Sequence, residues 1–366
     1  MVPERIFSAD SHVIEPADVW TTRIEPRFAD RAPRVVKRIA DREGDFFVAE
    51  GLHPFPVAGF AVAGVDPKQF GAAMAAGYPG VRPSAWDPVE RLKDQDYDGV
   101  VGEVLYPSLG MRLFQLEDGE LRAASFRAYN DWLADYCAHS PRRLAGVAMI
   151  SPDETDAGVA ELERTAKKGL RGAMIWGAAP AEKPYSDRAY DSFWAAAQDH
   201  AMPLSLHILT ERRVGGELQS VMKGYPALHH SAERSLTELI FGGVLERYPR
   251  LKIVSVENDI GWIAHFLQRM DHSFSKYRYL EREAIPNPPS FYFRRQVHAT
   301  FQDDRVGVIT RGFIGTNALM WASDFPHSDS TWPNSREVIA RDFEGVPDAE
   351  VRMMISGNAA EIYRLG

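Results

Sequence analysis

The feature that most constrains the fold is a series of eight short apolar runs, most of them followed by a loop and a stretch with helical periodicity. Runs of this length are typical of strands buried on both faces, and their alternation with helices indicates parallel strands joined by helical crossovers. Eight such units favour an α/β fold of the closed (β/α)8 TIM-barrel type over an open doubly wound sheet. The runs are RIFSAD (5–10), GVVGEVL (99–105), LAGVAMI (144–150), RGAMIW (171–176), PLSLHI (203–208), KIVSVE (252–257), QVHATF (296–301) and LMWASD (319–324).

Two segments do not fit a simple repeat. Residues 13–98 are too many for one strand-to-helix loop, and they contain a pattern that predicts a hairpin around 42–45. We interpret 13–98 as a long insertion after the first strand, near the barrel mouth. The tail 336–365 predicts C-terminal closing helices. The chain 1–366 is therefore expected to be a single barrel domain.

Composition excludes several classes of function. The 366 residues carry 42 basic and 51 acidic side chains, a formal net charge of -9, without a run rich in Lys or Arg. A nucleic-acid or membrane-surface role is therefore unsupported, and a small-molecule partner is expected. Nowhere do about 18 apolar residues run together, so we expect no membrane span. Cys137 is the single cysteine, which rules out an intrachain disulfide and fits a cytoplasmic protein.

Potential ligands and proton carriers stand where several of the expected strands end. In a (β/α)8 barrel the carboxyl ends of all strands converge on one mouth, where catalytic groups lie. The first run ends at Asp10-Ser11-His12, the fifth at His207, the sixth at Glu257 and the eighth at Asp324. The sequence therefore predicts one polar site built from four separate strands.

The same residues predict a metal centre. Asp10 and His12 are two positions apart, so an extended strand points both side chains to the same side. Alone, this pair is as well explained by a helix cap or a satisfied polar pair, and His207 by a satisfied buried histidine. Asp324 follows a buried strand, where a lone carboxylate would be costly without a cation. Together, Asp10, His12, His207 and Asp324 are predicted to bind one divalent ion.

Further candidates are individually less specific. His327, three residues after Asp324, is a candidate for substrate hydrogen bonding or acid–base chemistry, or for structural capping. Arg212 and Arg213 follow His207 closely, and either could bind a substrate carboxylate in a bidentate manner or simply be solvated. Trp332 is a candidate wall for a flat ring, with core packing as the alternative.

Taken together, these motifs resemble the amidohydrolase superfamily. They resemble in particular the amidohydrolase-2 branch, which includes aminocarboxymuconate semialdehyde, resorcylate-type and carboxyvanillate-type decarboxylases. The resemblance covers about residues 5 to 363, and the order and separation of its motifs are specific. It rests on SADSHVIEP, MPLSLHI, LERYPRLKIVSVENDIGWIAHFLQRMD, MWASDFPHSDSTWP and SGNAAEIYRL.

This resemblance implies a metal-dependent barrel with zinc or manganese, commonly a homodimer. His12 and His207 match the family's paired histidine ligands, and Asp324 matches the aspartate that is both ligand and proton carrier. The first position of the usual His-x-His motif is Asp10 here, as in members that use Asp or Glu. The family's decarboxylases usually place a histidine after strand six, where this chain has Glu257. With no lysine offered as a carboxylated bridge, a mononuclear site is expected.

The resemblance and the residues lead to a ranked set of functions. The leading hypothesis is a metal-dependent carboxy-lyase acting on an aromatic or enol-like carboxylic acid, with Asp324 or Glu257 as the proton carrier. The rival is a metal-dependent hydrolase of an amide, ester, lactone or C–C bond, in which Asp324 accepts a proton from metal-bound water. A third hypothesis is an inactive barrel with a binding role.

Overall fold

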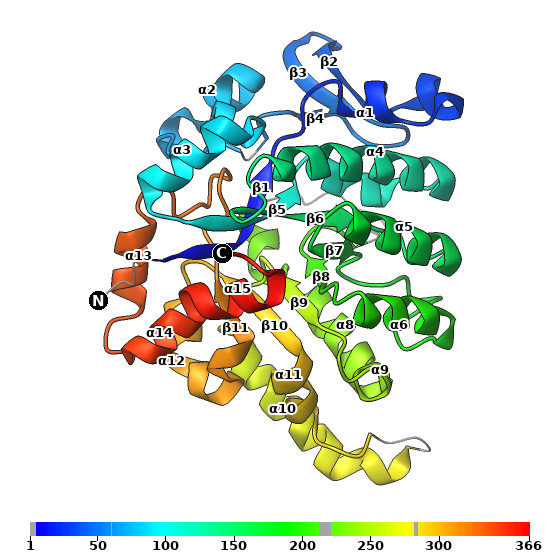
Figure 1. Ribbon diagram of the computed structural model, residues 1–366, viewed down its shortest axis with the longest axis vertical. Coiled ribbons are helices and arrows are strands. Elements are labelled where there is room, and N and C mark those ends of the chain that lie inside the picture. The colour runs from blue at the N-terminus through cyan, green and yellow to red at the C-terminus, as the bar shows by residue number, and fades with distance from the viewer. Residues whose placement is uncertain (1–4, 60, 212–220, 282–284) are drawn as a thin grey trace.

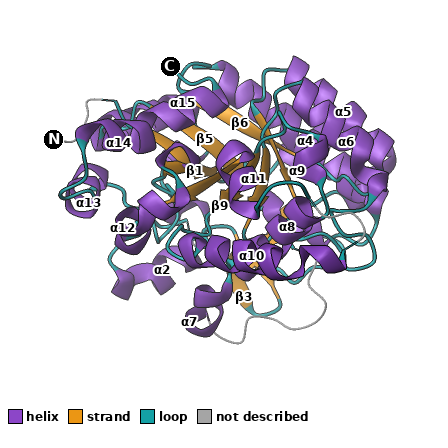
Figure 2. Ribbon diagram, turned by 90° about the horizontal axis from the view of Figure 1, so that it is seen from below, coloured by secondary structure: helices purple, strands orange, loops and turns teal. Residues whose placement is uncertain are grey.

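Eight parallel strands form the centre of the molecule in the computed structural model, which describes residues 5–59, 61–211, 221–281 and 285–366. The strands neighbour one another in the order β1-β5-β6-β7-β8-β9-β10-β11, and helices lie around them (Figures 1 and 2). The predicted (β/α)8 barrel is therefore confirmed. Its strands are β1 (Phe7–Val13), β5 (Gly102–Pro107), β6 (Leu144–Met149), β7 (Gly172–Ile175), β8 (Leu204–His207), β9 (Ile253–Val256), β10 (Val297–Phe301) and β11 (Leu319–Trp321).

Each of the eight apolar runs overlaps one barrel strand, with shifts at the ends. β1 continues to Val13, three residues beyond the expected end, whereas β11 stops at Trp321, three residues before Asp324. Asp324 therefore lies in the loop after β11, and the run 319–324 overstates that strand. Hydrophobicity marks which residues are buried, and Ala322 and Ser323 are buried without being part of the sheet.

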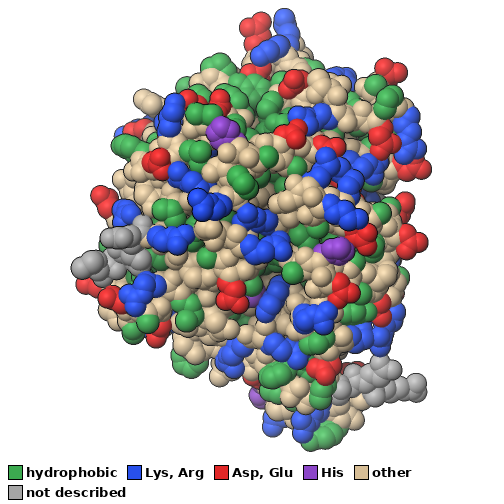
Figure 3. All heavy atoms as spheres, viewed as in Figure 1, with side chains coloured by type: hydrophobic (Ala, Val, Ile, Leu, Met, Phe, Trp, Pro, Cys, Tyr) green, Lys and Arg blue, Asp and Glu red, His purple; other side chains and the backbone are tan. Residues whose placement is uncertain are grey.

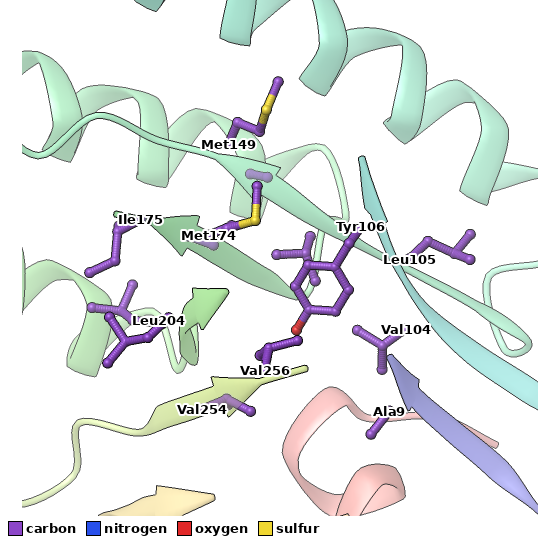
Figure 4. Packing of buried hydrophobic residues seen from close by; sticks show 14 of the residues in the cluster. Ala9, Val104, Leu105, Tyr106, Met149, Met174, Ile175, Leu204, Val254 and Val256 are labelled. Carbon is purple, nitrogen blue, oxygen red and sulfur yellow. The ribbon is translucent and has the colours of Figure 1, made fainter. Parts of the chain in front are cut away.

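Side chains, not solvent, fill the barrel interior. Figure 4 shows Tyr106 of β5 reaching inward between Met174 of β7 and Val256 of β9, with Val104 of its own strand nearby. Its hydroxyl lies 2.9 Å from the Ser205 hydroxyl and 3.1 Å from the Tyr363 hydroxyl. This packed floor lets only groups at the carboxyl ends of the strands face the mouth.

Hydrogen bonds close the barrel between its first and last strands. The backbone N–H of His12 donates to the carbonyl of Phe325 at 2.7 Å, and the N–H of Asp324 donates to the carbonyl of Asp10 at 2.9 Å. The N–H of Ser323 also donates to the Ser8 hydroxyl at 2.8 Å. These bonds fix the first and last predicted ligand segments against each other.

The long segment after β1 forms a layer of its own at the edge of the barrel. It holds the antiparallel strands β2 (Arg34–Ile39), β3 (Arg42–Val48) and β4 (Phe55–Pro56) and the helices α1 (Val19–Arg23), α2 (Phe70–Ala75) and α3 (Pro88–Asp98) (Figure 1). The predicted hairpin is present, but its turn lies at Ala40–Asp41, earlier than the expected 42–45. Ala40 adopts the positive φ of 51° that the turn requires, a conformation that sequence patterns assign to glycine.

The remaining helices surround the sheet and follow the expected amphipathic stretches. The tail forms the predicted closing helices, with α15 packed near β1 and β11. Cys137 lies buried in α4. The helices are α4 (Gly119–Ala138), α5 (Thr155–Lys167), α6 (Asp191–Asp199), α7 (Val221–Gly224), α8 (His230–Phe241), α9 (Val244–Arg247), α10 (Ile263–Tyr277), α11 (Pro289–Gln296), α12 (Arg305–Ile314), α13 (Ser335–Asp342), α14 (Asp348–Arg352) and α15 (Asn358–Tyr363).

Acidic and basic side chains are interspersed on the face of the molecule seen in Figure 3. Among the described residues, no helix combines the length and apolar character that a membrane crossing requires. Both observations agree with the absence of basic runs in the sequence.

Candidate metal centre at the barrel mouth

Five predicted site residues meet at the mouth of the barrel. Asp10 and His12 lie on β1, His207 is the last residue of β8, Glu257 directly follows β9, and Asp324 lies in the loop after β11. The side chains of Asp10, His12, His207 and Asp324 are at most 1 % exposed, and that of Glu257 is 14 % exposed. The structure thus brings together residues that are up to 314 positions apart.

The Nε2 atom of His12 lies at the centre of this group. It is 3.5 Å from Oδ1 of Asp10, 3.6 Å from Oε2 of Glu257 and 3.4 Å from Oδ1 of Asp324. Nε2 of His207 lies 3.4 Å from the same Glu257 oxygen and 3.8 Å from Asp10 Oδ1. One ion with bonds of about 2.0–2.2 Å would separate its donor atoms by similar distances.

Backbone carbonyls orient both histidine rings. Nδ1 of His12 lies 2.8 Å from the carbonyl of Pro107, and Nδ1 of His207 lies 3.0 Å from the carbonyl of Ile208. A carbonyl can only accept, so Nδ1 must carry the proton in each ring. The lone pair is then on Nε2, which faces the carboxylates, as in histidines that bind metals.

The atoms that face one another have no hydrogen-bond partner among the described residues. They are both side-chain oxygens of Asp10 and of Asp324, Oε2 of Glu257, and Nε2 of His12 and of His207. Buried polar atoms are normally paired, because an unpaired one loses its interaction with water without compensation. A divalent cation would form bonds with the nearest of these atoms and would offset the negative charge of the remaining carboxylate oxygens, so the residues present fit a metal ion.

The electrostatics of the group also favour a cation. Burial, and then the neighbouring Asp324, raise the pKa of Glu257 well above its usual value; burial and Asp10 do the same for the pKa of Asp324. Burial lowers the pKa of His12, an effect that His327 and His207 reinforce. The group repels its own negative charges, which a bound cation would offset. It also keeps its central histidine neutral, and the neutral imidazole is the form that binds a metal.

Two of the carboxylates have a strained backbone. Glu257 and Asp324 have φ values of 56° and 57°, in the left-handed region that residues other than glycine rarely adopt. Such a conformation costs on the order of 1–3 kcal/mol for each residue and is found most often at functional sites. In both cases the strained residue immediately follows a strand or the short loop after one, where it turns its carboxylate into the mouth.

The geometry separates the five residues into two overlapping groups. Ligand atoms of Asp10, His12, His207 and Glu257 all lie within 4.8 Å of one another. Asp324 instead belongs to a second group of this size, with His12, Glu257 and His327. The sequence had Asp324 as the fourth ligand and Glu257 as a neighbouring acid, whereas in the structure Glu257 is the carboxylate common to both groups.

His327 lies at this site, as the sequence suggested. Its Nδ1 is 3.0 Å from Oδ1 of Asp324, and its Nε2 is 3.0 Å from the hydroxyl of Ser108. Its ring stacks obliquely on that of His12, with centroids 4.0 Å apart. Burial lowers the pKa of His327 despite the nearby Glu257 carboxylate. Ser108, which follows β5, carried no signal in the sequence beyond its position at a strand end.

Sequence reasoning also missed two buried groups that hold the ligand segments. Arg91, fully buried, donates to the carbonyl of His12 at 2.8 Å and to that of Phe325 at 3.2 Å, and it pairs with Glu103 at 2.6 Å. It is held by α3, where Asp87 caps the first turn and Gly99 ends the helix with a φ of 78°. In the sequence, the Asp-Pro and Asp-Gly pairs indicate the two ends of this helix. They do not indicate that the Arg91 side chain points toward the ligand segments.

Glu15 is the second missed group. Its carboxylate accepts from the N–H groups of Leu109 at 3.0 Å and Gly110 at 2.8 Å, the two residues after Ser108. Burial, which outweighs these hydrogen bonds, raises the pKa of Glu15 to about 7. The apolar Val13-Ile14 before Glu15 in the sequence indicated burial but not this contact.

A cavity of about 400 Å³ lies beside the metal-binding group. Its lining includes Trp332, the predicted ring wall, together with Tyr225, Gln302 and Asp329. A smaller space of about 10 Å³, lined by Asp10 and Glu257 among others, shares Tyr225, Asp259 and Gln302 with it. The shared residues connect the larger cavity to the metal-binding group.

Two predicted substrate residues, Arg212 and Arg213, lie outside the described residues. His229 and His230 form a separate group with Glu233 at the start of α8, where the His229 ring stacks on Trp262 at 5.4 Å. His229 and His230 are not part of either group at the barrel mouth.

Comparison with known proteins agrees with this geometry. The model of the amidohydrolase family matches residues 52–365. A gamma-resorcylate decarboxylase from Rhizobium sp. (strain MTP-10005) is 24% identical over 274 residues, which cover 69% of this chain and 82% of that protein.

Solved structures show the same fold. An amidohydrolase from Mycobacterium avium subsp. paratuberculosis K-10 matches with a TM-score of 0.80 and 19% identity, covering 98% of this chain and 97% of that one. A dihydroxybenzoic acid decarboxylase from Polaromonas sp. JS666, solved with manganese and the inhibitor 2-nitroresorcinol, has a TM-score of 0.68 and 16% identity, covering 98% and 96%. Since the family model spans most of the sequence, the chain belongs to the amidohydrolase family.

Proposed function

We propose that the protein is a metal-dependent, non-oxidative decarboxylase of a hydroxylated aromatic carboxylic acid. The observation that carries this proposal is the set of buried, unpartnered ligand atoms from Asp10, His12, His207, Glu257 and Asp324 at the barrel mouth. The resorcylate and dihydroxybenzoate decarboxylases among its relatives support the reaction, and one of them binds manganese. The cavity beside the group offers room for a ring, with Trp332 as one wall.

In this proposal Asp10, His12, His207 and Glu257 hold the ion. Glu257 takes the place expected for Asp324 because its ligand atom lies with all three other ligands within 4.8 Å. Two carboxylates beside the two imidazoles shift the preference toward a hard ion such as Mn²⁺, with Zn²⁺ as the alternative. When bound, the ion supplies a Lewis acid that orients the substrate carboxylate and its neighbouring hydroxyl.

Asp324 and His327 then handle the proton. Nδ1 of His327 lies 3.0 Å from Oδ1 of Asp324, so these two side chains can hold a proton between them and pass it on. Protonation of the ring carbon that bears the carboxylate interrupts the conjugation of the ring. Cleavage of the bond to the carboxylate releases CO₂ and returns that electron pair to the ring, which restores the conjugation. Proton transfer by a positioned side chain typically contributes about 10²–10⁴-fold to the rate.

The test is CO₂ release from hydroxybenzoates by Mn²⁺-loaded protein, with 2,6-dihydroxybenzoate as the first substrate. We expect turnover that chelation abolishes, and a loss of at least about 100-fold in kcat for Asp324→Asn. Asp156→Asn, an exposed aspartate on α5, is the matched control and should retain full activity. Hydrolysis of esters or amides without CO₂ release from any hydroxybenzoate would replace the decarboxylase by the hydrolase hypothesis.

The substrate contacts of Arg212 and Arg213, the homodimer and the cytoplasmic location stay predictions. Sedimentation of the purified protein measures its oligomeric state directly. Alanine variants at positions 212 and 213 should raise KM more than they lower kcat if these side chains bind the substrate carboxylate.

A further inference from the structure

The cavity beside the metal-binding group is strongly acidic. Of the ten residues that line it, three are aspartates, namely Asp259, Asp303 and Asp329, and these described lining residues include no lysine, arginine or histidine. Its volume of about 400 Å³ falls in the usual range of small-molecule sites. Whatever occupies the cavity therefore meets several negative charges.

Among the described residues, two of these aspartates accept hydrogen bonds from neutral groups only. The carboxylate of Asp329 accepts from the hydroxyl of Tyr225 and, at 2.9 Å, from the side-chain amide of Gln302. The backbone of Gln302 donates to Asp259, whose pKa is raised to about 7 by burial and then by repulsion from other aspartates. Only Asp303 is paired with a cation, Arg341, at 2.5 Å. Within the part of the chain that the structure describes, two of the three aspartates thus have no cation paired with them.

The cavity adjoins the metal-binding group. Tyr225, Asp259 and Gln302 line both the cavity and the small space beside Asp10 and Glu257. Asp10 is 1 % exposed, and neither of its carboxylate oxygens has a hydrogen-bond partner among the described residues. A substrate anchored at the ion by its carboxylate can therefore extend past these shared residues toward the aspartates.

We propose that this cavity selects aromatic monocarboxylates with a hydrogen-bond donor at the end of the molecule away from the metal. The donor is a hydroxyl or an ammonium group, and the cavity rejects a second carboxylate at that position. This inference rests on the proposed function, because it takes the metal-binding group as the anchor of the first carboxylate. Trp332, Tyr225 and Val338 supply the flat and apolar surface for the ring. Asp329 and Asp259 supply the acceptors, and the negative charge of Asp329 repels an anion.

Binding of three matched probes to the Mn²⁺-loaded protein tests the inference. Each is a 2-nitrophenol, in which the nitro group replaces the metal-binding carboxylate and cannot leave as CO₂. The ring carbon opposite the nitro group carries a hydroxymethyl, an aminomethyl or a carboxylate group, and the hydroxymethyl is chosen because its hydroxyl stays neutral, unlike a phenol opposite a nitro group. Calorimetry should give dissociation constants for the first two that are at least about tenfold lower than for the third, the effect of roughly one unfavourable charge contact.

Asp329→Asn assigns the discrimination to this cavity. Asparagine keeps an oxygen that can accept from Tyr225 and Gln302 but has no charge. The ratio of the dissociation constant of the carboxylate probe to that of the hydroxyl probe should therefore fall at least about threefold. Asp156→Asn removes the same charge from the exposed surface of α5 and should leave the discrimination unchanged.

Equal binding of the hydroxyl and carboxylate probes, or the same discrimination in Asp329→Asn as in the parent protein, would overturn the inference while leaving the proposed function intact. If none of the three probes binds the metal-loaded protein, the anchoring role of the metal fails, and with it both the proposed function and the inference.

Discussion

Glu257 and Asp324 each combine a buried carboxylate with a left-handed backbone, two features that cost folding free energy. Neither feature is needed for the barrel itself, because β9 and β11 end before these residues. At the scale of single residues, the site therefore lowers the folding stability of the protein in return for groups that can bind a metal and carry a proton. The trade-off can be measured at Glu257.

Glu257→Gln should stabilise the metal-free protein and weaken its metal binding. Glutamine has nearly the same shape but no charge to bury beside Asp324 and Asp10. We expect the free energy of unfolding of the chelated protein at pH 8 to rise by about 1–2 kcal/mol, and Mn²⁺ affinity to fall at least tenfold. Urea denaturation and metal titration measure the two effects. Unchanged Mn²⁺ affinity would show that Glu257 is not a ligand.

Glu15 predicts a pH dependence of stability. Its pKa is raised from 4.5 to about 7 in the folded protein, so folding favours its protonated form. The stability that this form contributes is fully present below about pH 4.5 and is lost as the pH rises through 7, a change of about 3 kcal/mol. Glu15→Gln cannot lose a proton, so the stability of the parent protein relative to this variant should fall by that amount between pH 4.5 and pH 8. Parallel pH profiles of the two proteins would contradict this assignment.

Single residues differed in how well the sequence predicted them. Asp10, His12 and His207 were identifiable because they lie within or at the end of apolar runs, where an uncompensated polar group is conspicuous. The grouping of Glu257, and not Asp324, with Asp10, His12 and His207 was not predictable, because both carboxylates follow strands and only the backbone turn at each decides how far it reaches. Ser108 and Gln302 are ordinary loop residues in the sequence, and only the fold brings them to the site.

At the scale of elements, the insertion does more than cover the barrel. Through Arg91, α3 binds the carbonyls of His12 and Phe325 from the first and last ligand segments, and Glu103 on β5 holds the guanidinium in place. The strands were predictable from hydrophobicity, which reports burial. The role of α3 was not, because a buried arginine has no sequence pattern that distinguishes it from a solvated one.

Arg91→Met should be strongly destabilising because it leaves Glu103 buried without its partner. We expect a loss of about 3–5 kcal/mol, and a smaller loss in Arg91→Met/Glu103→Met, which removes both charges. Arg250→Met breaks an exposed pair with Asp199 and should cost less than about 1 kcal/mol. Denaturant unfolding of the four proteins measures these values. If the double variant were less stable than Arg91→Met alone, the pair would not be the reason for the loss.

At the scale of the whole molecule, eight strand ends and one insertion converge on a mouth whose inner part is built to hold a cation and whose outer cavity is acidic. The barrel and the location of its site followed from the order of the apolar runs, because parallel strands in this fold all direct their carboxyl ends to one side. The outer cavity did not follow, since Tyr225, Asp259, Gln302 and Asp329 come from separate loops whose paths depend on the packing of the complete barrel.

The central claim is that the buried ligand atoms hold one divalent ion, and anomalous scattering from crystals grown with Mn²⁺ tests it most directly. The account predicts one manganese peak per chain, within about 2.0–2.4 Å of atoms from Asp10, His12, His207 and Glu257, and none in crystals of His12→Ala grown in the same way. Parent crystals without a manganese peak at the barrel mouth, or with manganese bound only elsewhere, would contradict it.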